Sequence, residues 1–242
     1  MSGVLLAEDK GRVRILTMNR PEKLNALDTA LTESLLAALE AADADERISV
    51  VVLTGAGRAF CAGADIGEFK DLMGDRAERR GELTMRLHGI FPRMKKPVIA
   101  AARGAAMGGG AGLALASDLV VASENAKFGY PEIKHGILPA IVMANLVKQV
   151  GRKAAFELAA VGEPIGAHRA LELGMVNRVV KDEDLMREAT NLAVNLSSRA
   201  QDALFAIKAL FHSVSEMPLQ KGLEEGRKAN VAMRAKFKEG KP

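Results

Sequence analysis

Hydrophobic and polar positions change in blocks along the first half of the chain, and these blocks predict strands separated by helices. Two segments rich in valine, isoleucine and leucine, 3–8 and 12–18, flank the turn-forming sequence at 9–11 and predict a hairpin. Asp28 is suited to cap a helix that runs to about Ala42, because leucine and alanine recur there at helical spacing. The chain therefore begins with a β-hairpin followed by an amphipathic helix.

Three continuous apolar runs follow, at 48–55, 95–104 and 118–123. Runs of this length and composition are typical of strands that are buried on both faces. A glycine-containing loop and a polar, helix-like stretch to about Arg93 separate the first two runs, and a short helix separates the second from the third. Alternation of this kind predicts an α/β fold with parallel strand pairing.

From Ala140 onward helical periodicity dominates, and only 175–180 is predicted to be a strand. The predicted helices cover 140–149, 151–161, 167–173, 182–199, 201–215 and 218–238. Small apolar faces on C-terminal helices are suited to packing against another subunit, so we expect an oligomer.

The composition is that of a globular protein, with 242 residues, of which 48% are hydrophobic and 26% charged. A net charge of +4 is spread along the chain, and the absence of tryptophan disfavours a base-stacking surface, so nucleic acid is not an expected partner. No apolar run reaches the length of a membrane span, and no secretory signal is recognised. With the single cysteine, Cys61, these features predict a cytoplasmic protein without a cysteine-based metal site.

Glycines cluster at two strand-to-helix junctions, FCAGAD (60–65) and MGGGAG (107–112). The N-terminus of a helix carries unpaired N–H groups and a partial positive charge. Two such junctions facing one point would form an oxyanion hole for a developing negative charge. The alternative is that the glycines only let a helix pack closely on a strand. A nucleotide site is disfavoured because the spacing is not G-x-G-x-x-G and no Walker lysine follows.

Four segments, in this order, resemble the crotonase superfamily, the enoyl-CoA hydratase/isomerase group. They are MNRPEKLNALDTAL, VVVLTGAGRAFCAGADIGEF, KKPVIAAARGAAMGGGAGLALASDLVVASENAKFGYPEIKHGILPA and GEPIGAHRALELGMVNRVV. The resemblance implies a spiral of ββα units with two nearly perpendicular sheets over 1–195, and a helical trimerisation region over 196–242. It also implies trimers or hexamers, an acyl-CoA thioester as substrate, and no metal or separate cofactor.

The same resemblance implies roles for individual residues. The backbone N–H groups of Ala64 and Gly109 would bind the thioester oxygen. The residues expected to contact the substrate or its CoA are Lys23, Leu24, Ala62, Asp65, Ile66, Gly110 and Gly112. Lys95 and Lys96 could meet CoA phosphates, but a solvated strand flank is the favoured interpretation for both.

Hydratases of the family carry two glutamates, and here the first position is Gly112 while the second is Glu132. Two carboxylates suit the addition of water, whereas one is sufficient to move a double bond, so hydration and isomerisation both stay open. A glycine at 112 is also expected to open space for a bulky acyl group. Decarboxylation, thioester hydrolysis and a non-catalytic RNA-binding role are the alternatives on this scaffold.

Four further residues are considered for the site. His135 could reach the same cavity as Glu132, although a hydrogen-bonding role near a helix end is favoured. Cys61 is interpreted as a small buried residue rather than a nucleophile, because no base is suggested nearby. Tyr130 either lines the pocket or packs in the core with its hydroxyl at the rim. Asp118 is expected to be structural.

Overall fold

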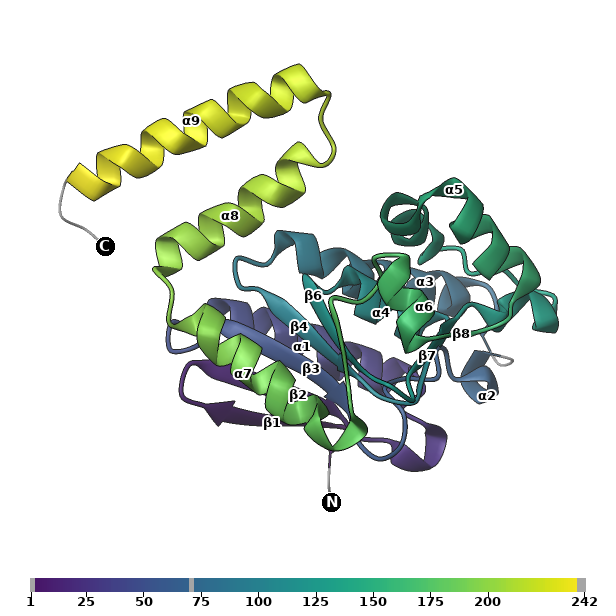
Figure 1. The fold of residues 1–242 in the computed structure, drawn as a ribbon. Coiled ribbons are helices and arrows are strands. Elements are labelled where there is room, and N and C mark those ends of the chain that lie inside the picture. The colour runs from purple at the N-terminus through teal and green to yellow at the C-terminus, as the bar shows by residue number, and fades with distance from the viewer. Residues whose placement is uncertain (1–2, 70–71, 239–242) are drawn as a thin grey trace.

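The computed structural model describes residues 3–69 and 72–238, and its centre is a six-stranded sheet in the order β1-β2-β3-β4-β6-β9 (Figure 1). The strands are β1 (Leu5–Lys10), β2 (Val13–Met18), β3 (Val50–Gly55), β4 (Val98–Ala102), β6 (Leu119–Ser123) and β9 (Arg178–Val180). The hairpin β1–β2 is antiparallel and each later pair in this sheet is parallel. The predicted α/β architecture is confirmed.

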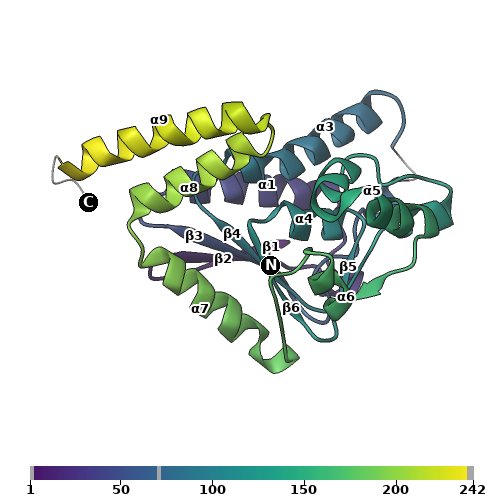
Figure 2. The same ribbon diagram turned by 45° about the horizontal axis from the view of Figure 1, so that its top comes forward.

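Both faces of this sheet are covered, which is why its strands read as continuous apolar runs. On one face, α7 (Leu185–Ser197) packs Leu185, Ala189 and Ala193 against side chains such as Val52 and Ile99. The other face is covered by α1 (Thr29–Ala44), α3 (Asp75–Ile90) and α4 (Gly109–Ala116) (Figure 2). Residues of β3 and β4 point alternately to these two layers.

A second, smaller sheet, in the order β5-β7-β8, is formed by strands that the hydrophobic pattern did not predict. Its strands are β5 (Ala105–Met107), β7 (Lys127–Gly129) and β8 (Ile165–Gly166). Strands this short show no detectable alternation of apolar and polar residues. The expectation of a single strand after Ala140, at 175–180, is wrong, because β8 also lies after Ala140. The small sheet matters for function because β5 leads directly into α4 and β7 leads directly to Glu132.

The hairpin turn begins two residues later than predicted and ends one residue later. Asp9 and Lys10 belong to β1, and the turn falls at Gly11 and Arg12, where Gly11 has φ of +60°. Asp9 stays in the strand because it faces Arg14 across the pair, and its Oδ1 accepts a 2.7 Å hydrogen bond from Arg14 Nε. A polar residue in the strand was thus mistaken for a turn residue.

The C-terminal part is helical, as expected, with one break. The helices are α5 (Met143–Val161), α6 (Ala167–Glu172), α7, α8 (Gln201–Val214) and α9 (Leu219–Lys238). The break predicted between 149 and 151 corresponds to a kink at Gly151, where φ is +76°. Helices α8 and α9 extend beyond the sheet (Figure 1).

Helix α8 is attached to the core by buried polar contacts. Lys208 Nζ donates to Asp118 Oδ2 at 2.7 Å and to the Lys96 carbonyl oxygen at 2.9 Å, which gives Asp118 the structural role expected of it. Lys96 is only 4% exposed, and its Nζ donates to the Ala42 carbonyl oxygen at 2.7 Å. The solvated position favoured for Lys96 is therefore wrong, whereas Lys95 is exposed. Within the described ranges, none of the helices combines the length and apolarity needed to cross a bilayer.

Candidate active site

The two glycine-rich junctions are held side by side by backbone contacts. Cys61 N donates to the Ala105 carbonyl oxygen and Met107 N donates to the Cys61 carbonyl oxygen, both at 2.9 Å. Helix α4 approaches this loop so closely that a Cβ on Gly110 would lie 2.2 Å from the Cys61 carbonyl oxygen. Only glycine permits that approach. Gly110 is therefore required for close packing of α4 on the loop, and this packing places the neighbouring Gly109 next to the loop.

The amides of Ala64 and Gly109 lie near each other. A Cβ on Gly109 would be 4.0 Å from Ala64 N, and a Cβ on Gly63 would be 3.5 Å from Gly109 N. Within the described part of the chain, neither amide donates a hydrogen bond to a protein acceptor. Ala64 and Gly109 also line the same cavity, of about 400 Å³. Two unpaired donors beside one cavity are what an oxyanion site requires.

The rest of the cavity wall is mostly apolar. One side is formed by α3 and the other by residues 137–142. The lining residues are Leu27, Ala64, Asp65, Glu68, Leu72, Ala77, Arg80, Gly81, Thr84, Gly109, Glu132 and Ile137–Val142. An apolar cleft with a few polar groups is typical of a small-molecule site. Among the described residues, no cluster of side chains is suited to hold a metal ion.

Glu132 is brought to the cavity by the 3-10 helix Pro131–His135, which follows β7. Its carboxylate lies against Gly108, where a Cβ would be 2.5 Å from Oε1. Its Oε2 is buried and has no hydrogen-bond partner among the described residues. Burial of this kind disfavours the charged form and raises the pKa of Glu132 above its ordinary value.

The other carboxylates of the cavity are already occupied. Asp65 Oδ2 accepts from Arg20 Nη2 at 3.0 Å, and its Oδ1 accepts from Gly67 N at 3.0 Å. Glu68 Oε2 accepts from Thr29 N at 2.9 Å. Glu132 is therefore the carboxylate of this cavity that is available for proton transfer.

We expect Glu132→Gln to raise the melting temperature more at pH 8 than at pH 4.5. Because the folded-state pKa of Glu132 is raised, the folded chain keeps this proton to higher pH than the unfolded chain does. Ionisation therefore lowers the free energy of unfolding as pH rises from 4.5 through the raised pKa, and glutamine removes that loss. Melting curves of both proteins at the two pH values test this. An equal difference at both would show that the carboxylate is not desolvated.

The loop that carries Ala64 is fixed by residues that the sequence did not single out. Arg80 Nη2 donates to the Leu27 carbonyl oxygen at 2.9 Å, and the same oxygen accepts from Asp65 N at 3.1 Å. Arg20 Nη2 contacts both Asp28 Oδ2 and Asp65 Oδ2. Arg80 lies in a strongly charged stretch of sequence, so the sequence does not distinguish it from neighbouring charged residues that face solvent.

Gly112 does not open space in the cavity, contrary to the expectation from sequence. A Cβ at this position would lie 2.3 Å from Val142 Cγ1 and 2.9 Å from His88 Nε2. Val142 lines the cavity, and Gly112 is buried behind it. The ring nitrogens of His88 lie 2.9 Å from the Thr84 carbonyl oxygen and 3.1 Å from the Gly109 carbonyl oxygen, and burial lowers the pKa of His88. Val142 and His88 thus fill the room that a longer residue 112 would need.

The remaining predicted substrate contacts lie beside the cavity rather than in its wall. Lys23 and Ile66 are exposed, and the half-buried Ala62 donates its N–H to the Leu24 carbonyl oxygen at 2.9 Å. Gly110 is buried against the Cys61 loop and does not line the cavity. Of the CoA-binding residues expected from the sequence, the structure brings only Asp65 into the cavity wall.

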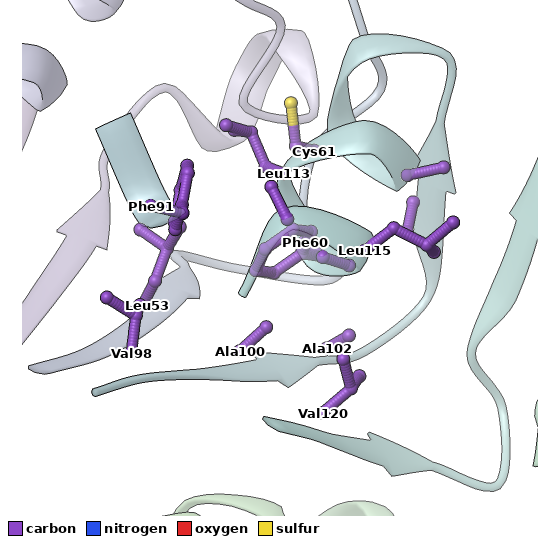
Figure 3. Close-up of a cluster of buried hydrophobic side chains, with 14 of the residues drawn as sticks. Leu53, Phe60, Cys61, Phe91, Val98, Ala100, Ala102, Leu113, Leu115 and Val120 are labelled. Atoms are coloured by element: carbon purple, nitrogen blue, oxygen red, sulfur yellow. The ribbon is translucent and has the colours of Figure 1, made fainter. Parts of the chain in front are cut away.

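Three other candidates, Cys61, His135 and Tyr130, lie outside the cavity wall. Cys61 packs in the core near Leu113 (Figure 3), and burial raises the pKa of its thiol to about 12, as expected for a packing residue. His135 is exposed and does not line the cavity. Tyr130 does not line the cavity, and its ring packs in the core, as in the second interpretation. Its hydroxyl, however, is buried without a partner among the described residues rather than at a rim.

Known proteins with similar sequences and folds include several that are named enoyl-CoA hydratases. Residues 8–241 match the profile of the family described as Enoyl-CoA hydratase/isomerase. The 2,3-dehydroadipyl-CoA hydratase of Escherichia coli is 41% identical, with 92% of this chain and 87% of that protein covered. An enoyl-CoA hydratase structure from Mycobacterium smegmatis superimposes with a TM-score of 0.93 at 30% identity, covering 99% and 97% of the two chains. One from Geobacillus kaustophilus gives a TM-score of 0.90 at 37% identity, covering 99% and 96%.

Proposed function

Because the chain belongs to the enoyl-CoA hydratase/isomerase family, we propose that it binds an enoyl-CoA thioester and moves a proton on the enolate formed from it. One observation carries this proposal. The amides of Ala64 and Gly109 and the buried carboxylate oxygen of Glu132 belong to residues that line a single, mostly apolar cavity, and none of the three has a hydrogen-bond partner among the described residues.

In the proposed reaction the N–H groups of Ala64 and Gly109 donate to the thioester carbonyl oxygen. Glu132 removes a proton from C2 of a 3-enoyl-CoA, and the electron pair of the broken C–H bond moves towards that oxygen. Each donor of such a site contributes about 3–4 kcal/mol to the stability of the charged state. Glu132 then returns the proton to C4, so that the double bond moves from C3–C4 to C2–C3 and no other reactant is needed.

The raised pKa of Glu132 supports this role. A carboxylate with an ordinary pKa is a weak base near neutral pH, and desolvation makes it a stronger one. Its buried Oε2 has no protein donor among the described residues, so it is available to accept the substrate proton. Bond migration is favoured over hydration because this cavity supplies one available carboxylate.

Hydration is the second candidate, and the names of the relatives favour it. Water addition requires a group that holds the water and exchanges protons with Glu132. In this chain Gly112 has no side chain, and Val142 fills the adjacent room. A hydratase built on this site would therefore have to position the water with Glu132 alone.

For the CoA portion we propose the surface beside the Ala64 loop. Lys23, Leu24, Ala62 and Ile66 lie there, and the hydrogen bond between Ala62 N and the Leu24 carbonyl oxygen joins the two loops that carry them. Backbone groups of these residues would make much of the contact with CoA, so the identity of their side chains matters less. The proposed reaction uses CoA as part of the substrate and calls for no metal and no further cofactor.

A panel of 2-enoyl and 3-enoyl thioesters tests the proposed reaction. Water addition and bond migration are scored separately, by loss of the conjugated thioester absorbance and by chromatography of the products. We expect conversion of 3-enoyl-CoA to 2-enoyl-CoA to be the faster reaction. If water addition to crotonyl-CoA is faster, hydration is the correct assignment; if neither product forms, the proposed chemistry is wrong.

We further propose that the protein is a cytoplasmic homo-trimer or hexamer, with a core of 1–195 and an oligomerisation region of 196–242. Large apolar side chains are exposed to water on α8 and α9 of the single chain, and contact with another subunit would bury them. They are Ile207, Phe211, Leu219, Leu223 and Val231, each more than half exposed. Light scattering after size-exclusion chromatography tests this, and a monomer would contradict it.

A further inference from the structure

Apart from Arg80, the residues of α3 that line the cavity have small or short side chains. Ala77, Gly81 and Thr84 follow one another at helical spacing along one face of the helix, and all three line the cavity. Opposite them lie apolar residues of the segment 137–142. The cavity therefore has the form of a slot between a narrow helix face and an apolar loop.

Gly81 has no structural reason to be glycine. It lies well inside the 16-residue helix Asp75–Ile90, where glycine is one of the poorest helix formers. Its φ is not among the positive values that require glycine, and, apart from its chain neighbours and the backbone of the same helix, no described atom lies within 4 Å of the place where its Cβ would be. The space that Gly81 leaves is therefore open, in contrast to the filled space at Gly112.

The arginine of the cavity wall, Arg80, is already paired. Arg80 Nη2 donates to the Leu27 carbonyl oxygen and to Thr32 Oγ1, and its Nε lies 3.6 Å from Glu68 Oε2. A cation committed in this way is a poor receptor for a carboxylate at the end of an acyl chain. The lining thus favours an uncharged hydrocarbon group.

We propose that Gly81 is a specificity-determining residue, which opens the slot to uncharged acyl groups longer than the four carbons of crotonyl. The acyl chain runs from the thioester, held at Ala64 and Gly109, along α3 and over Gly81. This inference rests on the proposed function only in that a CoA thioester enters the cavity; it does not depend on which reaction follows.

The test compares the binding of butyryl-CoA and octanoyl-CoA, which are saturated and so have no double bond to move or hydrate. Each CH₂ moved from water into an apolar slot strengthens binding by up to about fourfold. We expect the parent to bind octanoyl-CoA at least about tenfold more tightly than butyryl-CoA. In Gly81→Leu this preference should be lost, with butyryl-CoA binding unchanged within about twofold, and Gly81→Ala should lie between.

Glu82→Leu is the matched control, because it adds the same side chain at the next position of α3, which is exposed and does not line the cavity. It should keep the parent preference. Melting curves report on folding, and if Gly81→Leu does not fold, Gly81→Ala decides.

The outcomes separate this inference from the proposed function. A parent without octanoyl preference, or a Gly81→Leu variant that keeps it, overturns the inference even when enoyl-CoA turnover is intact. A parent that shows the preference, loses it in Gly81→Leu and turns over no enoyl-CoA supports the inference and overturns the proposed reaction.

Discussion

Replacement of Glu132 by glutamine is expected to lower kcat for enoyl-CoA by about 10³-fold, since a positioned general base contributes on that scale. Glutamine keeps the size of the side chain but cannot take the proton from C2. Binding of a saturated acyl-CoA should change little, because the amides of Ala64 and Gly109 and the apolar slot are untouched. Steady-state rates and the Kd of butyryl-CoA, measured on the same preparations, test both statements.

Glu163→Gln is a suitable control for that substitution. Glu163 is exposed, and it pairs with Lys134 at 2.7 Å, outside the cavity. Its replacement should leave kcat at the parent value. A Glu132→Gln protein as active as the parent would show that another group transfers the proton.

Gly112→Glu is expected to lower the free energy of unfolding by about 3 kcal/mol or more, combining overpacking with burial of a charge. The added Cβ would lie 2.3 Å from Val142 Cγ1, and the carboxylate would enter the space beside His88. Restoring a second glutamate is therefore not expected to increase water addition to crotonyl-CoA. Urea denaturation and hydration assays on the purified variant measure the two effects.

A second substitution tests whether Gly112→Glu fails to add water because the new side chain does not fit or because a second carboxylate does not promote hydration here. Val142→Ala removes the methyl group that a new Cβ at 112 would meet, so combining it with Gly112→Glu should recover part of the lost stability. Gly112→Ala should be destabilising to a smaller degree. A stable Gly112→Glu single variant would mean that Val142 and His88 move aside easily, and that the cavity can accept a second carboxylate.

The large sheet could be predicted from the sequence because both of its faces are covered. Burial on two sides makes β3, β4 and β6 continuous apolar runs, which stand out from their polar flanks. The strands of the small sheet could not be predicted from the hydrophobic pattern, since β8 has two residues and β5 and β7 have three each. The residues that those short strands position, Gly109 and Glu132, were nevertheless recognisable, because glycine and family motifs mark them.

Two errors, at Gly112 and Lys96, and the omission of Arg80 have a common physical origin, in contacts between segments far apart in the sequence. Gly112 looked like a source of space because nothing local shows that Val142 folds over it. Lys96 looked solvated because its acceptors, the carbonyl oxygens of Ala42 and Asp45, lie at the end of α1. Arg80, which supports the Ala64 loop through Leu27, was hidden among other charged residues for the same reason.

The small sheet places Gly109 and Glu132 at fixed positions relative to each other. Met107, the last residue of β5, is in register with Gly129, the last residue of β7, and Gly108 N donates to the Gly129 carbonyl oxygen at 2.8 Å. The proposed oxyanion donor lies two residues beyond one strand end, and the proposed base lies three residues beyond the other. Gly81 lies on α3, outside this ladder, so a substitution there can change the proposed acyl preference while the spacing between donor and base stays the same.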